Sequence, residues 1–215
     1  MVKLIRGILD FRKNVLPERK ETFARLAKGQ TPDVLFITCS DSRVAPNWFA
    51  STDPGDLFVV RNVGNIVPLS PPIGSTGSDC SVAAAIEFAL LTLKVSSIVV
   101  CGHSGCGAIH ALAKGEQKGA PSHLKHWLGL AGKLDTMPID DDKSLSLEDR
   151  LSQRNVLNQI ETLKTYPVVY EHVRNGKLKL YSWWFNIAEG TVYAFDEKRR
   201  QFVVINEEVG AAYLR

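Results

Sequence analysis

Short apolar runs alternate with longer stretches of helical periodicity along the middle of the chain. Each run is rich in β-branched residues and is followed by polar or glycine-rich residues, which is typical of a buried parallel strand. The predicted strands are VLFITCS (34–40), LFVVRNV (57–63) and SSIVVCG (96–102). The predicted helices are Ser81–Leu93, 105–114, 122–134 and 147–165. This alternation predicts an α/β fold, with helices flanking a central, mostly parallel β-sheet.

Residues 1–30 carry a different pattern. Leu4, Ile8, Phe11 and Val15 recur at helical spacing among charged residues. They predict an amphipathic N-terminal helical arm, which packs on the protein's own core or on a neighbouring subunit. Because charges interrupt the apolar positions, the segment does not resemble a signal peptide.

The last part of the chain favours antiparallel strands. The stretch KLKLYSWWFNIAEGTVYAFD (177–196) has a turn near Glu189–Gly190, and it predicts a hairpin that adds an edge strand to the sheet. Loops are expected at 64–79 and at 135–146. A chain of 215 residues fits one domain over 1–215.

Composition narrows the classes of function. Lys and Arg number 26 against 23 Asp and Glu, and this formal charge of +3 is spread along the chain, so nucleic-acid binding is not expected. No run approaches the roughly 20 apolar residues that span a bilayer, so we expect a cytoplasmic protein without a membrane partner. Its four cysteines are then thiols or metal ligands rather than disulfides.

The stretch VVCGHSGCGAIH (99–110) carries the densest chemistry. The order of its glycines does not follow the dinucleotide fingerprint, and its last glycine lacks the Lys and Ser or Thr of a phosphate loop. Cys106 stands where a nucleophile elbow requires glycine, and it is too far from Cys101 for a redox dithiol. An imidazole and a thiol three residues apart remain, His103 and Cys106.

Cys39 ends another predicted parallel strand, and sites form beyond the carboxyl ends of such strands. Together with His103 and Cys106 it would offer the nitrogen and sulfur donors that zinc prefers, with a fourth position open as in catalytic sites. A second interpretation stays open at this point. In it, Cys39 is a core residue, Asp41 caps a helix and Arg43 lies on the surface.

Four motifs of the chain resemble those of the β-class carbonic anhydrases of bacterial and cyanobacterial type. They are CSDSR (39–43), GDLFVVRNVGNIVP (55–68), AAAIEFAL (83–90) and VVCGHSGCG (99–107). The resemblance extends over nearly the whole chain. It implies one zinc ion per subunit, held by Cys39, His103 and Cys106, and the reversible hydration of carbon dioxide to bicarbonate and a proton.

The resemblance also implies that Asp41 and Arg43 form a catalytic dyad. Zinc can lower the pKa of its bound water to about 7, and the resulting hydroxide attacks carbon dioxide. Two thiolates donate more charge than neutral imidazoles, so this zinc should acidify its water less than a three-histidine site does. Asp41 then orients the hydroxide by accepting its hydrogen bond, and Arg43 fixes the carboxylate. The family also has an inactive state in which the aspartate closes the zinc shell.

Regulated members of the family bind inhibitory bicarbonate through a Trp, an Arg and a Tyr. The corresponding positions here hold Phe36, Arg61 and Phe185, so two of the three polar partners are replaced. Gln30 stands where the plant-like subgroup has a glutamine that donates to the substrate. We therefore expect a plant-like active site with an open zinc position and little regulation by bicarbonate.

By the same resemblance, the substrate pocket is lined by Gln30, Phe58, Val63, Gly107 and Phe88, with Phe58 supplied by the partner subunit. Phe88 departs from the family, which often has Tyr at this position, so polar contacts or the proton path should differ. The resemblance also implies a homo-oligomer, dimeric or higher, whose active sites lie near the dimer interface.

Two other functions use the same scaffold. Hydrolysis of carbon disulfide or carbonyl sulfide would employ the same metal ligands, and a single sequence does not separate it from carbon dioxide hydration. A non-catalytic zinc or thiol sensor is disfavoured, because Asp41 and Arg43 are not needed to hold a metal.

Overall fold

The computed structural model describes residues 1–70, 80–134, 139 and 142–213, in two units, Met1–Thr31 and Pro32–Arg215. The first unit is helical, with α1 (Val2–Asp10), a π-helical turn (Phe11–Val15) and α2 (Leu16–Leu26) following one another without a break. The predicted N-terminal helix is therefore confirmed, and its apolar residues Leu4 and Ile8 are exposed. The organisation as one domain over 1–215, with 1–30 as an arm, stays a prediction.

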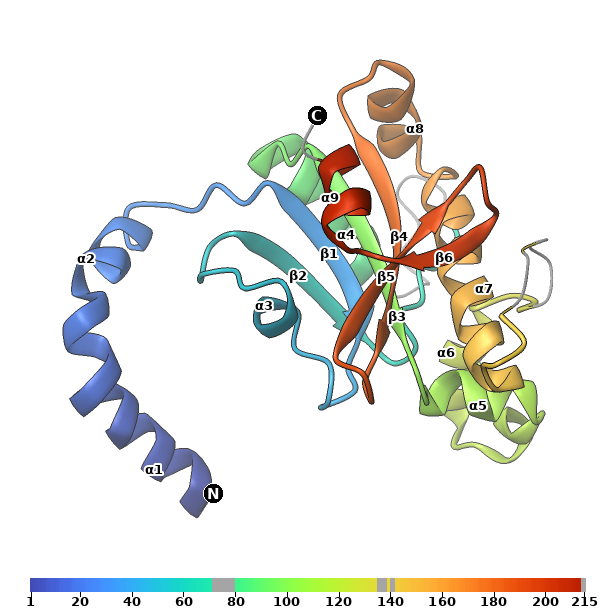
Figure 1. Ribbon diagram of the computed structural model, residues 1–215, viewed down its shortest axis with the longest axis horizontal. Coiled ribbons are helices and arrows are strands. Elements are labelled where there is room, and N and C mark those ends of the chain that lie inside the picture. The colour runs from blue at the N-terminus through green and yellow to red at the C-terminus, as the bar shows by residue number, and fades with distance from the viewer. Residues whose placement is uncertain (71–79, 135–138, 140–141, 214–215) are drawn as a thin grey trace. The chain divides into compact units, whose positions relative to one another are not determined.

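The second unit is built on a mixed sheet (Figure 1). Six strands in its described residues lie in the order β2–β1–β3–β4–β5–β6. They are β1 (Val34–Cys39), β2 (Leu57–Asn62), β3 (Ser97–His103), β4 (Lys179–Asn186), β5 (Thr191–Asp196) and β6 (Gln201–Val204). Pairs among β1 to β4 are parallel, and β5 and β6 pair antiparallel. The predicted parallel strands and the β4–β5 hairpin are confirmed, and β6, which the sequence did not predict, forms the edge beyond the hairpin.

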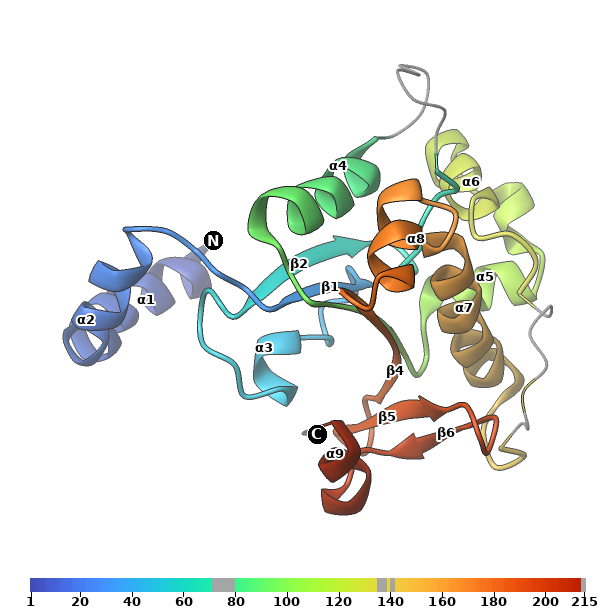
Figure 2. The ribbon, with the colours of Figure 1, turned by 90° about the horizontal axis from the view of Figure 1, so that it is seen from above.

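Helices lie on both faces of this sheet. They are α3 (Pro46–Phe49), α4 (Ser81–Glu87) with a π-helical continuation (Phe88–Leu93), α5 (Gly107–Ala113), a 3-10 turn (Glu116–Gly119), α6 (Ser122–Gly129), α7 (Leu147–Leu163), α8 (Pro167–Arg174) and α9 (Glu207–Tyr213). Figure 2 shows α4 and α8 on one side of β1 and β2, and α3 on the other. No helix in the described ranges is long and apolar enough to cross a bilayer.

Side chains of β1 alternate between the two faces, as expected for a strand that is buried on both sides. Leu35 and Ile37 join the core cluster that includes Val156 of α7. Phe36 points to the opposite face and contacts Phe49 of α3, with ring centroids 6.1 Å apart. The fold class predicted from the sequence is confirmed.

Three helices are shorter than predicted, and α7 lacks only the last two residues of its predicted range. The helix expected at 105–114 begins at Gly107, because Gly105 has a left-handed backbone with φ 61°. The helix expected at 122–134 ends at Gly129, and the backbone becomes left-handed at Gly132 with φ 72°. Of the predicted loops, residues 71–79, 135–138 and 140–141 lie outside the described residues.

The carboxyl ends of β1 and β3 meet at one edge of the sheet. β1 ends at Cys39 and β3 ends at His103, and the register pairs Thr38 of β1 with Cys101 of β3. The loops that follow the two strands therefore emerge side by side, although they are far apart in the sequence. This convergence is the structural basis of the site.

Gly102 lies where β3 passes α7, and it supports a prediction about stability. A Cβ at this position would lie 2.7 Å from Cγ2 of Val156 and 3.3 Å from the backbone oxygen of Ser152. We expect Gly102→Ala to lower the free energy of unfolding by about 1–3 kcal/mol, measured by urea denaturation. Val156→Ala in the same chain should recover part of that loss, whereas Gly129→Ala, where a Cβ meets nothing within 4 Å, should have little effect. An equal loss with and without Val156→Ala would contradict the steric explanation.

Candidate metal centre

Three potential metal ligands converge at the ends of β1 and β3. Cys39 is the last residue of β1, His103 is the last residue of β3, and Cys106 directly precedes α5. Their ligand atoms all lie within 4.8 Å of one another, and all three residues are buried. Two sulfurs and one imidazole nitrogen form a donor set that suits zinc and leaves a fourth position for a non-protein ligand.

His103 presents an unpaired ring nitrogen. Its Nδ1 lies 3.0 Å from the backbone oxygen of Ser104, and because a carbonyl oxygen can only accept, Nδ1 donates the hydrogen bond. Its Nε2, which then carries the lone pair, is buried and has no hydrogen-bond partner among the described residues. A buried acceptor without a partner is costly, so the imidazole fits the role of a metal ligand whose tautomer is fixed by Ser104.

The two cysteine side chains shift each other's pKa in opposite directions. A hydrogen bond from the Cys106 thiol is the main cause that lowers the pKa of Cys39 to about 4, although burial opposes it. The same hydrogen bond, together with burial, raises the pKa of Cys106. The backbone N–H of Gly64 also donates to Sγ of Cys39, at 3.4 Å. Cys39 is therefore a thiolate at neutral pH, which is the form of cysteine that binds metals.

Asp41 and Arg43 lie beside this cluster and bind each other. Nε of Arg43 donates to Oδ1 of Asp41 at 2.9 Å, and a terminal guanidinium nitrogen donates to Oδ2 at 2.7 Å. These side-chain bonds, chiefly, hold the pKa of Asp41 well below its usual range. Oδ2 lies 4.0 Å from Nε2 of His103, and the same guanidinium nitrogen donates to the carbonyl of Gly105 at 3.1 Å. The pair thus connects the two ligand-bearing loops.

The interpretation of Asp41 as a helix cap is wrong. The following helix, α3, begins at Pro46, and its N-cap position is Ala45 without a side-chain hydrogen bond. Asp41 instead accepts a hydrogen bond from the backbone N–H of Arg43 at 2.9 Å, inside the turn that follows β1. The carboxylate is therefore held by Arg43 and does not cap a helix.

Arg61 forms hydrogen bonds with the backbone around the site. Its guanidinium donates to the carbonyls of Cys39, Asp41 and Val44, at 3.2, 2.8 and 2.7 Å. These bonds tie the loop after β1 to β2. The positions that correspond to the Trp and Tyr of regulated relatives hold Phe36, which is buried, and Phe185, which stacks on Phe49 with ring centroids 4.5 Å apart.

The structure does not bring all five predicted pocket residues together. Gly107 follows Cys106 in the sequence, and Val63 lies between Asn62, which pairs with Cys39, and Gly64, which donates to Sγ of Cys39. The carbonyl of Val63 accepts a hydrogen bond from Nε1 of Trp127 at 2.7 Å. Phe58 pairs with Leu35 near the start of β1, whereas Cys39 ends that strand.

Phe88 packs against Phe58, with ring centroids 5.7 Å apart, and so lies toward the same end of β2. Gln30 is an exposed residue of the first unit, between α2 and β1. The roles of Gln30, Phe58, Val63, Gly107 and Phe88 stay predictions.

Sequence reasoning missed four residues of α7 that contact the site loops. We call Asp149, Ser152, Asn155 and Gln159 the α7 polar face. Asp149 accepts a hydrogen bond from the N–H of Gly105 at 2.7 Å, and Ser152 donates one to the carbonyl of His103 at 2.9 Å. Asn155 donates to the carbonyl of Gly64 at 3.1 Å, and Gln159 accepts from the N–H of Val67 at 2.8 Å. Their spacing of three, three and four residues was the available signal, since it places them on one side of a helix.

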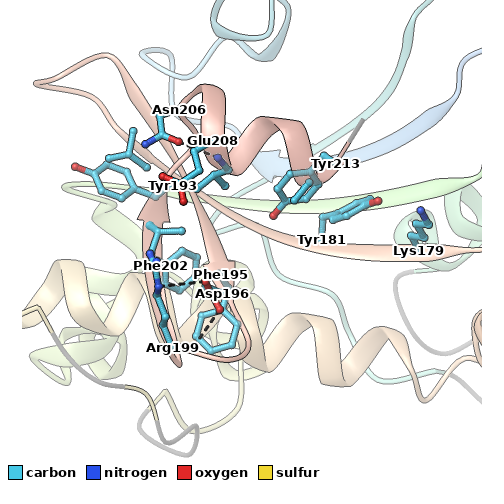
Figure 3. Close-up of a pocket in the computed structure, with 14 residues that line it drawn as sticks. Lys179, Tyr181, Tyr193, Phe195, Asp196, Arg199, Phe202, Asn206, Glu208 and Tyr213 are labelled. Atoms are coloured by element: carbon cyan, nitrogen blue, oxygen red, sulfur yellow. Dashed lines mark hydrogen bonds and ion pairs between the residues drawn. The ribbon is translucent and has the colours of Figure 1, made fainter. Parts of the chain in front are cut away.

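A large cavity lies elsewhere in the second unit. It measures about 850 Å³ and is lined by β4, β5, β6 and α9. On its walls Tyr181 lies next to Tyr213, and Asp196 forms an ion pair with Arg199 (Figure 3). None of the metal-cluster residues lines it. A cavity of about 420 Å³ adjoins the site loops instead, and its walls include Ser40 and Val63.

Comparisons with known proteins agree with this geometry. A family model described as carbonic anhydrase matches residues 34–192. The carbonic anhydrase of Synechocystis sp. is 37% identical, over 98% of this chain and 77% of that protein. That of Pseudomonas aeruginosa is 38% identical over 96% of this chain and 93% of the relative, and beta carbonic anhydrase 1 of Caenorhabditis elegans is 32% identical over 97% and 89%.

Solved structures point to the same family. The structure of the β-carbonic anhydrase CcaA superposes with a TM-score of 0.83 at 37% identity, covering 95% of this chain and 98% of that chain. A tetrameric β-carbonic anhydrase of Sordaria macrospora superposes with a TM-score of 0.70 at 30% identity, covering 89% and 94%. The family match, the relatives across the chain and the Cys–His–Cys cluster agree: this chain belongs to the β-carbonic anhydrases, a family of enzymes.

Proposed function

We propose that this protein catalyses the zinc-dependent, reversible hydration of carbon dioxide to bicarbonate and a proton. The observation that carries the proposal is the convergence of Cys39, His103 and Cys106 within 4.8 Å, next to a carboxylate that Arg43 holds. Membership of the family supports the reaction, and the sulfur and nitrogen donors support zinc as the metal.

The Asp41–Arg43 pair would orient the nucleophile. Zinc bound by the three ligands would lower the pKa of a water molecule, although less than a three-histidine site does, and so help to supply hydroxide. Asp41 is ionised at neutral pH, because the hydrogen bonds from Arg43 hold its pKa well below the usual range. A carboxylate only accepts hydrogen bonds, so Asp41 would accept one from the O–H of the nucleophile. A lone pair of the nucleophile's oxygen would then be directed at carbon dioxide. Arg43 would keep the carboxylate in this orientation.

We also propose that Asp41 stays outside the metal shell and that bicarbonate regulates the enzyme little. Both carboxylate oxygens of Asp41 accept hydrogen bonds from Arg43, which opposes movement onto the metal. Phe36 and Phe185 offer no donor to an anion, and Arg61 is engaged with three backbone carbonyls. These features support a plant-like site with an open position.

A second subunit would complete the substrate pocket. Val63 and Gly107 adjoin the metal ligands of their own chain, whereas Phe58 and Phe88 lie toward the other end of β1 and β2. Contact with substrate would therefore involve the partner subunit's Phe58, and Gln30 would donate its amide to the substrate. The exposed apolar residues of α1 and the tetrameric relative of Sordaria macrospora support a homo-oligomer.

A side-by-side assay tests the reaction. Purified, zinc-loaded protein should hydrate carbon dioxide far faster than buffer, should not hydrolyse carbonyl sulfide or carbon disulfide at a comparable rate, and should be inhibited by bicarbonate only through product competition. Turnover of the sulfur compounds without carbon dioxide hydration would favour the hydrolase alternative. Bound zinc without turnover of any of these substrates would favour a sensor.

A further inference from the structure

Asn155 of the α7 polar face is linked to a metal ligand through a single glycine. Its Nδ2 donates to the carbonyl of Gly64 at 3.1 Å, and the N–H of Gly64 donates to Sγ of Cys39 at 3.4 Å. Asn155 is fully buried, so water does not compete for this contact. The two hydrogen bonds hold Gly64 at both ends, between α7 and the cysteine sulfur.

Gly64 cannot hold its own orientation, because a glycine is conformationally permissive. Its φ is 83°, and a Cβ would lie 3.0 Å from Cβ of Ala108, so a residue with a side chain does not fit this position. The rest of the loop is fixed by Asn62, whose side chain both accepts from the N–H of Ile66 and donates to its carbonyl. Two outside anchors hold the peptides on either side of Gly64. Nε1 of Trp127 donates to the carbonyl of Val63 at 2.7 Å, in the peptide that carries the Gly64 N–H, and Asn155 holds the carbonyl of the next peptide.

Gln159 fixes the anchor in turn. Its Nε2 donates to Oδ1 of Asn155 at 2.9 Å, and its Oε1 accepts from the N–H of Val67 at 2.8 Å. The Asn155 amide can then present only its NH₂ group to the loop, since its oxygen is occupied. The buried chain of hydrogen bonds runs from Val67 through Gln159 and Asn155 to Gly64, and each member is satisfied.

We propose that Asn155 is a positioning residue for the metal centre: by holding the carbonyl of Gly64 it helps to keep the N–H of the same residue directed at Cys39, and so contributes to how tightly this thiolate binds the metal. The inference rests on the proposed function, since it assumes that the cluster binds zinc. An N–H bond to a ligating sulfur stabilises its charge and fixes its lone pairs, and such outer partners are worth about 10- to 100-fold in metal affinity.

Zinc affinity and a cobalt spectrum test the proposal on the full chain. Asn155→Ala should weaken zinc binding about 10-fold or more in competition with a chromophoric chelator. In the cobalt-loaded protein the sulfur-to-cobalt charge-transfer band should move to lower energy, because the sulfur loses a hydrogen-bond donor. Asn155→Leu, which keeps more of the side-chain volume, serves as a second variant in case the alanine variant does not fold, and the same two shifts are expected.

Ile160→Val is the matched control. Ile160 is a buried apolar residue of the same helix, in the core cluster that lacks the metal ligands, so its truncation should lower stability without moving the zinc affinity or the band. A folded Asn155 variant with unchanged zinc affinity and an unchanged charge-transfer band would overturn this proposal and leave the proposed function standing. A wild-type protein that binds no zinc would overturn it together with the proposed function, whereas zinc binding that depends on Asn155 would support it even if carbon dioxide were not hydrated.

Discussion

Cys106→Ser is expected to strip the metal from the protein and to reduce carbon dioxide hydration to the rate of the buffer. A serine hydroxyl stays protonated at neutral pH, so the site would keep only one sulfur and one imidazole of its three ligands. The loss in zinc affinity should exceed the roughly 100-fold that an outer partner contributes. Metal content after dialysis against a chelator measures it directly, and His103→Ala should behave in the same way.

Cys101→Ser is the matched control for this change. Cys101 is equally buried, in the strand that carries His103, but it is not a member of the cluster, and its thiol contacts the carbonyl of Gly102. The variant should retain both zinc and activity. Equal zinc content in Cys106→Ser and the wild type would contradict the assignment of the ligands.

Asp41→Ala is expected to separate metal binding from catalysis. Asp41 lies outside the group of three ligands, so the variant should retain its zinc. Without the carboxylate that orients the nucleophile, kcat/KM for carbon dioxide hydration should fall about 100-fold, the order found for a positioned hydrogen-bonding group. Stopped-flow kinetics and metal analysis on the same preparation measure both quantities.

The control for Asp41→Ala is Asp196→Ala. Asp196 also accepts hydrogen bonds in a turn and pairs with an arginine, Arg199, but it lines the large cavity away from the metal cluster. This variant should keep both its zinc and its rate. Unchanged activity of Asp41→Ala would show that the carboxylate has no part in the mechanism.

The lowered pKa of Asp41 determines over which pH range the Asp41–Arg43 pair stabilises the protein. Because the folded-state pKa is lowered, chiefly by the side chain of Arg43, the stability that the pair adds is present above the unfolded-state pKa of about 3.9 and is lost only as the pH falls below it. Any loss of activity between pH 8 and 6 therefore does not arise from protonation of Asp41.

The convergence of the three proposed metal ligands could be predicted from the sequence. The buried side chains of α7 that hydrogen-bond to the loops around them could not. Cys39 and His103 end apolar runs that are recognisable as parallel strands, and the ends of such strands meet at a common edge. Asn155 and Gln159 lie in a helical pattern where polar residues usually face solvent, yet both are almost fully buried. Only the packing of α7 against the loops shows that these amides are internal.

The hydrophobic pattern of the sequence also did not show the short strand β6 or the positions of Phe58 and Phe88. β6 spans only Gln201–Val204, too few residues for a period of two to stand out, so the edge of the sheet was missed. Phe58 and Phe88 were assigned to the pocket by resemblance, and within one chain they lie at the far end of β2 from Asn62, which pairs with Cys39. The proposed role of Phe58 involves a second subunit, which a single chain does not contain.

We propose that Cys39, His103 and Cys106 coordinate one zinc ion, whose open fourth position supports carbon dioxide hydration. Stopped-flow hydration on purified protein, before and after removal of metal with a chelator and again after zinc is returned, tests it most directly. We predict rapid hydration that disappears with the metal and recovers at one equivalent of zinc per chain. A preparation carrying one zinc per chain that leaves the buffer rate of carbon dioxide hydration unchanged would contradict the claim.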